Sequence, residues 1–115
     1  MSFWTRPAKK PVSAQQAMTY RLTGKAEDDF ISIYVTGVRD FGVAQAERYQ
    51  RDLIETFETL SDNPRLARAR QELRPPMRVH PHGSHLILYR IEENGDILIV
   101  RIRHAREDWI PDPQG

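Results

Sequence analysis

The dipeptide Asn94-Gly95 stands between two runs of alternating apolar and polar residues, 84–92 and 96–104. Asn and Gly readily adopt the positive φ angles that a tight β-hairpin turn requires, so this pattern is the strongest short-range hairpin signal. If these two residues form the whole loop, Glu93 faces Asp96 and the other pairs follow in steps of one. The sequence therefore predicts two antiparallel strands with a defined register.

This register gives the hairpin two faces. One face is apolar except at its histidine end, and we expect it to pack against helices. Its pairs are Ile91 with Leu98, Tyr89 with Val100, Ile87 with Ile102, and His85 with His104. The other face is half basic, and we expect it to be open or covered by a partner. Its pairs are Leu86 with Arg103, Leu88 with Arg101, Arg90 with Ile99, and Glu92 with Ile97. A slip of one residue would bury three arginines, so the pattern specifies the register.

The residues before the hairpin predict two helices. Residues 20–22 form a short strand, and Thr23 is the expected N-cap of a helix that ends at Gly42. Apolar residues at helical spacing then predict a second helix over 43–60, which a Ser-Asp-Asn-Pro stop follows. Two helices joined at one glycine form an antiparallel helical hairpin.

The remaining residues complete an α+β domain. Residues 65–71 are expected to form a short helix or an ordered loop, and residues 77–80 a strand that turns at 81–83. The order β-α-α-β-β-β predicts a short N-terminal strand, a helical hairpin and a three-stranded antiparallel sheet. We assign 19–110 to this single domain and expect a C-terminal tail at 111–115. Residues 1–18 lack periodicity, and we expect a flexible tail; a tag remnant or a start assigned too early explains them equally well.

Composition excludes several classes of protein. There is no cysteine, which rules out disulfides, thiol nucleophiles and Cys-type zinc sites. No apolar run approaches the length of a membrane span, and the N-terminus lacks the apolar core of a signal peptide, so we expect a cytoplasmic protein. The near-zero net charge hides an asymmetry, because residues 65–106 carry nine arginines, no lysine and four acids. Arginine forks suit phosphate and carboxylate recognition.

Catalytic and metal-binding patterns are weak. The four histidines (His80, His82, His85 and His104) have no carboxylate at ligand spacing, so turn and strand-end hydrogen bonds explain them better than a metal site does. His85 and His104 could form a buried polar pair across the hairpin. Ser84 next to His85 lacks the geometry of a nucleophile and base. We therefore expect no catalytic residue, no metal and no cofactor.

Five motifs together resemble one known family. They are Tyr20-x-Leu22-Thr23-x-x-Ala26-x-x-Asp29, Phe57-x-x-Leu60-x-x-Asn63-Pro64, Glu72-Leu73-Arg74-Pro75-Pro76-Met77-Arg78, His85-x-x-x-Tyr89, and His104-x-Arg106-x-Asp108. Over 20–109 they resemble, in order, the ParE toxins of the RelE/ParE superfamily. The chain departs from the family pattern at Pro76, where glycine is usual, and in residues 1–18.

The resemblance implies the toxin of a type II toxin–antitoxin system. ParE toxins trap the cleaved complex of DNA gyrase with DNA, and a ParD-type antitoxin neutralises them by wrapping the toxin with a helix and an extended segment. Gyrase as target and ParD as partner are therefore the expectations, with no enzymatic activity. A RelE-like mRNA endoribonuclease, or a degenerate member without toxicity, are the alternatives. We expect no sequence-specific nucleic-acid binding by the toxin alone, because residues 43–60 hold two arginines against four acids.

We expect the binding residues on the basic face of the hairpin and at its end. The candidates for antitoxin or target binding are Arg74, Arg78, Leu86, Leu88, Arg90, Arg101, Arg103, Arg106 and Trp109. The remaining motif residues are expected to be structural: His85, Tyr89, His104 and Asp108.

Overall fold

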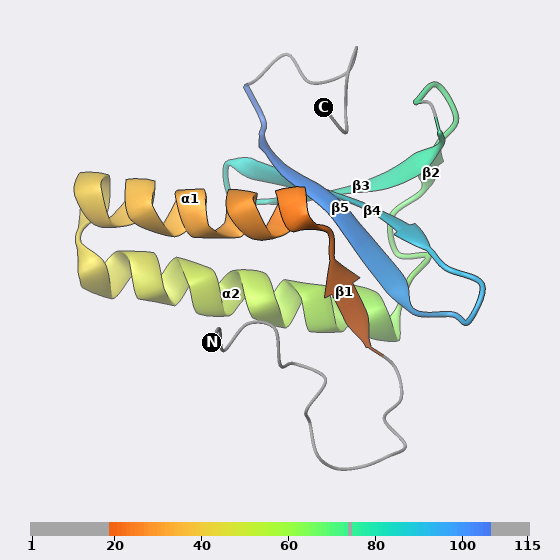
Figure 1. Cartoon of the computed structure of the whole chain (residues 1–115), viewed down its shortest axis with the longest axis horizontal. Coiled ribbons are helices and arrows are strands. Elements are labelled where there is room, and N and C mark those ends of the chain that lie inside the picture. The colour runs from red at the N-terminus through yellow and green to blue at the C-terminus, as the bar shows by residue number, and fades with distance from the viewer. Residues whose placement is uncertain (1–18, 74, 107–115) are drawn as a thin grey trace.

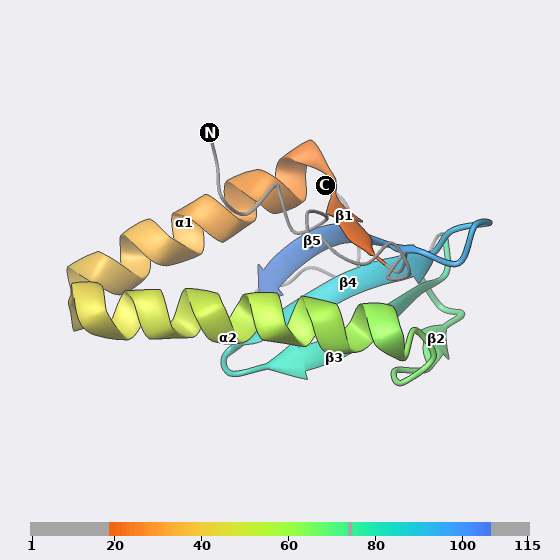
Figure 2. The same ribbon diagram turned by 90° about the horizontal axis from the view of Figure 1, so that it is seen from below.

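A computed structural model of the chain describes residues 19–73 and 75–106. Two helices, α1 (Gly24–Phe41) and α2 (Val43–Asp62), form an antiparallel hairpin that packs on one face of a β-sheet (Figures 1 and 2). The strands are β1 (Tyr20–Leu22), β2 (Ala69–Arg70), β3 (Met77–His82), β4 (His85–Ile91) and β5 (Ile97–His104). The predicted α+β class is confirmed.

The sheet is wider than predicted. Its order is β1-β5-β4-β3-β2, and β1 runs parallel to β5 while the other neighbours are antiparallel. The expected short helix or loop at 65–71 was partly wrong, because Ala69 and Arg70 pair with β3 as a two-residue edge strand. The strand β3 also continues to His82, so the turn to β4 is shorter than expected.

Local signals at the helix ends agree with the sequence. The Thr23 side chain accepts a hydrogen bond from the Ala26 N–H at 3.0 Å and donates one to the Val100 carbonyl at 2.7 Å. One hydroxyl therefore caps α1 and attaches it to β5. Gly42, with a φ of 93°, separates the helices and donates its N–H to the Val38 carbonyl.

The predicted hairpin register is correct in the half far from the loop and wrong in the half next to it. Pairs from His85 with His104 to Leu88 with Arg101 are confirmed, but beyond them Tyr89 pairs with Ile99 and Ile91 with Ile97. Two irregularities cause the shift. The loop has three residues, because the Glu92 N–H bonds the Asp96 carbonyl and Gly95 adopts a φ of 94°. Val100 is then an extra residue in β5, a β-bulge that restores the original register.

The bulge reverses the faces of the first half of β5. Ile97 and Ile99 were expected on the open face, but they lie on the helix-facing side and are fully buried. Leu98 and Val100 lie on the opposite side. The prediction for these four residues was wrong, because it assumed a two-residue loop and a regular strand.

Two apolar clusters follow from this arrangement. The main core joins the helices to the sheet and contains Tyr20, Ala26, Phe30, Leu53, Phe57, Leu60, Ala67, Ile87, Tyr89, Ile97, Ile99 and Ile102. A smaller cluster lies on the opposite side of the sheet: Leu73, Met77, Leu88, Leu98 and Val100. Neither α1 nor α2 is apolar over a length that would cross a membrane, and this holds only for the described residues.

Candidate functional site

Tyr89 in β4 lies on the helix-facing side, as predicted. Its side chain is fully buried, and its hydroxyl donates a hydrogen bond to the Pro64 carbonyl at 2.7 Å. The same oxygen accepts a longer bond from the Ala67 N–H at 3.4 Å. Burial raises the pKa of the Tyr89 phenol. These contacts fasten the loop after α2 to the sheet, so the position of Tyr89 is structural.

His85, at the other end of β4, belongs to a second set of contacts with α2. The Tyr49 hydroxyl is 3.0 Å from the His82 carbonyl and 2.8 Å from His85 Nδ1. Because a hydroxyl has one proton and the carbonyl can only accept, Tyr49 donates to His82 and His85 donates from Nδ1 to Tyr49. His85 is therefore in the Nδ1-protonated tautomer or fully protonated.

Thr56 holds His82 by the same logic. Its hydroxyl donates to the Asp52 carbonyl at 2.9 Å, so the 3.0 Å contact with His82 Nδ1 is a bond that the imidazole donates. Burial lowers the pKa of His82 and raises that of Tyr49. We call Tyr49, Thr56, His82 and His85 the α2 latch, since they join the middle of α2 to the β3–β4 turn.

His104 faces His85 across the hairpin, as predicted, with ring centroids 5.3 Å apart. The expected burial of this pair was wrong: His85 is half-buried and His104 is exposed. His104 Nδ1 accepts a hydrogen bond from the Arg106 N–H at 3.1 Å. Within residues 19–73 and 75–106, no cluster of His, Cys, Asp or Glu has the makings of a metal site.

Asp29 of α1 has a role that the sequence did not indicate. Its carboxylate accepts two hydrogen bonds from Arg101, at 2.7 and 2.9 Å, and a third from the Ile102 N–H at 2.9 Å. The two side chains are only 15% and 16% exposed. Arg101 was expected on the open face, but its guanidinium reaches α1, because β5 is bulged one residue earlier and lies next to the start of that helix.

Arg78 is also turned inward. It pairs with Tyr89 and therefore lies on the helix-facing side, where its Nη1 donates a 2.6 Å hydrogen bond to the Ala67 carbonyl. Its predicted place on the basic face was wrong. Met77, the residue before Arg78, points to the opposite side of the sheet instead.

The face opposite the helices is more closed than predicted. Leu88 was expected to be exposed there but is fully buried against Leu73, Met77, Leu98 and Val100. Leu86 is partly buried at the edge of this cluster. Arg90 and Arg106 are exposed and Arg103 is half-buried. Arg74, Asp108 and Trp109 lie outside the described residues. We call Leu86, Arg90, Arg103 and Arg106 the arginine surface.

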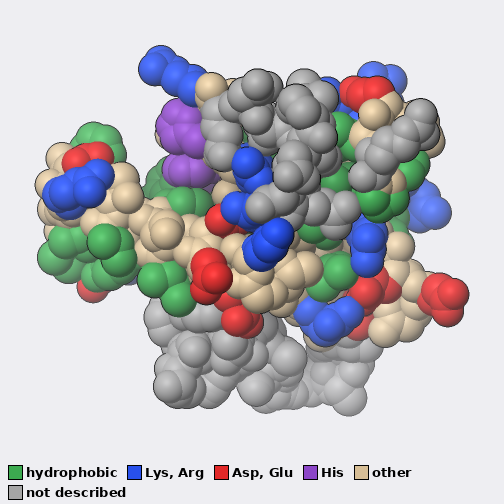
Figure 3. Space-filling view, turned by 45° about the horizontal axis from the view of Figure 1, so that its top comes forward, with side chains coloured by type: hydrophobic (Ala, Val, Ile, Leu, Met, Phe, Trp, Pro, Cys, Tyr) green, Lys and Arg blue, Asp and Glu red, His purple; other side chains and the backbone are tan. Residues whose placement is uncertain are grey.

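A groove lies beside the histidine end of the hairpin. It has a volume of about 550 Å³ and runs between the two helices near their tip and the β3–β4 turn. Its lining includes Ile33 and Phe41 of α1, Tyr49 of α2, and both His85 and His104. Figure 3 shows histidine side chains beside the narrow part of the molecule from which the tip of the helical hairpin projects. A largely apolar groove with histidines at one end suits an amphipathic protein segment.

The fold and these surfaces define a small α+β module whose conspicuous tyrosines and histidines hold the structure together. The ParE toxin family of type II toxin–antitoxin systems, parDE, matches residues 20–109. Toxin ParE1 of Mycobacterium tuberculosis is 37% identical over 89 residues, 77% of this chain and 91% of that protein. Toxin ParE1 of Caulobacter vibrioides is 32% identical over 85 residues, 74% of this chain and 86% of that protein.

A solved structure, described as the chromosomal ParDE TA system from P. aeruginosa, has the same fold. Its TM-score is 0.65 at 24% identity, over 76% of this chain and 95% of that one. The chain belongs to the ParE toxin family, and the resemblance seen in the five motifs is confirmed.

Proposed function

We propose that this chain poisons DNA gyrase by stabilising the cleaved gyrase–DNA complex, and that a ParD-type antitoxin neutralises it. The hydrogen bonds of two tyrosines support the proposal that this activity is not enzymatic. Tyr89 is fully buried and donates to a backbone carbonyl, and Tyr49 donates to another. A general acid or base must reach the proton it transfers, and these two phenols are already committed to the fold.

The arginine surface is the proposed place of partner contact. It combines cationic side chains with the partly buried Leu86, and both features suit an acidic, amphipathic segment. The arginine surface does not include Arg78, Leu88 and Arg101, because their side chains make contacts within the domain. Arg74 and Trp109 remain candidates from the sequence alone.

Assays with purified components test the target. The full chain is added to gyrase supercoiling and DNA-cleavage reactions, and to an mRNA cleavage reaction in parallel. We expect loss of supercoiling and accumulation of cleaved DNA, with intact RNA. RNA cleavage without an effect on gyrase would instead support the RelE-like alternative.

Charge reversals test the surface. Arg90→Glu and Arg103→Glu should each weaken binding of the cognate ParD-type antitoxin by about tenfold, which corresponds to about 1.4 kcal/mol. Arg39→Glu is the matched control, because Arg39 is an exposed arginine at the far end of α1. Isothermal titration calorimetry measures all three variants. Equal losses at Arg39 and Arg90 would mean that only net charge matters and would remove the arginine surface from the proposal.

A further inference from the structure

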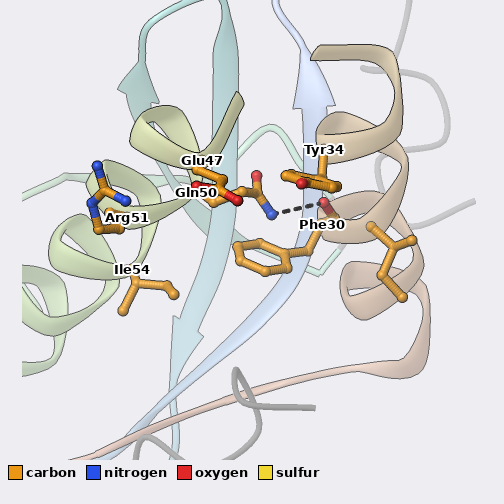
Figure 4. A pocket seen from close by; sticks show the side chains of 7 residues that line it. Phe30, Tyr34, Glu47, Gln50, Arg51 and Ile54 are labelled. Atoms are coloured by element: carbon orange, nitrogen blue, oxygen red, sulfur yellow. Dashed lines mark hydrogen bonds between the residues drawn. The ribbon is translucent and has the colours of Figure 1, made fainter. Parts of the chain in front are cut away.

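A second cavity lies between α1 and α2, away from the arginine surface. It has a volume of about 430 Å³, and its lining is predominantly apolar (Figure 4). The helices are close together near their tip, where a Cβ added to Gly37 would lie 3.3 Å from that of Ala46, and they diverge toward the sheet (Figure 2). The cavity occupies this widening space. Its lining residues are Phe30, Ile31, Tyr34, Glu47, Gln50, Arg51 and Ile54.

Gln50 brings an unused hydrogen-bond acceptor to this cavity. Only 7% of the residue is exposed. Nε2 donates to the Phe30 carbonyl at 3.3 Å, which fixes the orientation of the amide because a carbonyl cannot pair with Oε1. Oε1 is buried, and no donor from the described part of the chain reaches it. An unpaired buried acceptor destabilises the fold, so the cavity favours an occupant with an N–H or O–H group.

Residues 1–18 carry features that fit this cavity. They precede the region that matches the ParE family, and they contain two adjacent aromatic residues, Phe3 and Trp4. Tryptophan combines a large apolar surface with a single N–H donor and has no acceptor. It can therefore fill an apolar space and satisfy one buried acceptor, as Gln50 Oε1 requires.

The chain also reaches the cavity easily. Tyr20 packs against Phe57 of α2, with ring centroids 5.4 Å apart. Gln50 is seven residues before Phe57, about 10 Å along the helix. Trp4 is fifteen residues before Thr19, and such a segment spans up to about 50 Å when extended. The attachment point thus lies within a few residues' reach of the cavity.

Charge favours the same pairing. Residues 1–18 hold three basic side chains and no acid, whereas residues 19–64 hold nine acids and five bases. Glu47 lines the cavity, and Glu27 and Glu58 lie one helical turn from its lining residues Ile31 and Ile54. Burial, and then the nearby Glu58 carboxylate, raises the pKa of Tyr20, so this acid lies close to the point where residues 1–18 join the sheet.

We propose that residues 1–18 of the same chain dock on the helical hairpin, with the Trp4 indole in the α1–α2 cavity and its N–H bonded to Gln50 Oε1. The docked segment covers apolar surface that the ParE domain otherwise exposes on α1, including Ile31 at 47% exposure. The site is separate from the groove at the histidine end and does not depend on the proposed target.

Fluorescence of the full chain tests this proposal. Trp4 and Trp109 are the two tryptophans, so Trp109→Phe leaves Trp4 as the single reporter. We expect Trp4 emission to be blue-shifted relative to a free tryptophan amide and several-fold less sensitive to acrylamide quenching. Ile31→Asp, inside the cavity, should restore both values toward those of the free amide. Val35→Asp is the matched control, because Val35 is an exposed apolar residue one turn along α1 that does not line the cavity.

Three outcomes would overturn the proposal. The first is quenching of Trp4 as in the free amide. The second is protection that Ile31→Asp and Val35→Asp change equally, since Trp4 would then pack elsewhere. The third is protection that disappears on dilution, since the segment would then enter the cavity of a second copy. Circular dichroism verifies that each variant is folded, and Ile31→Ser repeats the test without an added charge.

Discussion

The two faces of the β4–β5 hairpin use polar side chains in different ways. On the helix-facing side, Tyr89 and the α2 latch bind backbone carbonyls and one another, and most of these groups are buried or half-buried. On the opposite side, Arg90 extends into solvent beside a small apolar cluster, and Arg106 is exposed just beyond the end of β5. The residue types that most suggest catalysis thus form hydrogen bonds within the domain, whereas the exposed arginines are the residues that we propose for partner contact.

This difference also predicts which substitutions lower stability and which lower binding. Removal of one partner of a buried hydrogen bond leaves the other partner without a bond and without water, which costs free energy of folding. Removal of an exposed charge costs little, because water solvates the group that remains. Substitutions on the helix-facing side should therefore lower stability, and those on the opposite side should lower binding.

Gly83→Ala should cause the largest loss of stability, because the added Cβ would clash with Tyr49 of the α2 latch. Gly83 has a φ of 58°, and an added Cβ would lie 2.6 Å from the Tyr49 hydroxyl oxygen. We expect about 3 kcal/mol of destabilisation from backbone strain and the clash together. Gly95→Ala is the control, because Gly95 also has a positive φ but open space around its Cα. It should cost about 1–2 kcal/mol. Urea unfolding measures both, and equal losses would show that Tyr49 does not constrain the turn.

Asp29→Ala tests the arginine that crosses from the basic side to the helices. It leaves the Arg101 guanidinium and the Ile102 N–H without their shared acceptor, and we expect a loss of about 3 kcal/mol. Glu92→Ala is the control. Glu92 accepts two bonds of similar length from Arg21, but that arginine is 61% exposed, so the loss should stay below about 1 kcal/mol. Chemical denaturation of both variants would contradict this account if the losses were alike.

Features of the fold that depend on neighbouring residues could be predicted from the sequence, and features that depend on distant contacts could not. The start of α1 and the first four hairpin pairs depend on local features, such as the Thr23 cap and the alternation of apolar residues, so they could be predicted. The end of α2 was predicted less well, because the helix continues to Asp62, two residues beyond its expected end. The bulge at Val100 could not be predicted. The Val100 carbonyl accepts a hydrogen bond from the hydroxyl of Thr23, which lies 77 residues earlier in the chain. No local pattern in β5 indicates that contact. The face assigned to Ile97 and Ile99 failed for this reason.

The candidate site shows the same limit. Tyr89 was placed correctly because a regular alternation within β4 decides its face. Arg101 was misplaced because its partner, Asp29, lies on another element, and no pattern in the sequence connects these two residues. Contacts between distant elements decide which arginines stay on the surface, and a single sequence does not contain them.

Tyr89→Phe separates a structural role from a catalytic one. The variant keeps the buried ring but loses the 2.7 Å hydrogen bond to the Pro64 carbonyl, so we expect about 1–2 kcal/mol of destabilisation. Inhibition of gyrase should be unchanged at a temperature where the variant is folded. Tyr34→Phe, on the half-buried side of α1, serves as the control for both measurements. Loss of activity in a folded Tyr89→Phe protein would return this phenol to the list of functional groups.

The smallest expected effect is a pH dependence at His82. Burial lowers its pKa in the folded state, so between that value and the unfolded value of about 6.5 the unfolded chain binds more protons. The contribution of His82 to stability is therefore complete above about pH 6.5 and falls as the pH drops toward the folded pKa. His82→Asn keeps a donor near the Nδ1 position for Thr56 but cannot titrate. Urea unfolding at pH 7.5 and 5.5 should show a smaller difference for His82→Asn than for the unaltered chain. His104→Asn, at the exposed histidine across the hairpin, is the comparison variant, and an equal change in both variants would mean that burial in the α2 latch does not set the pH dependence at His82.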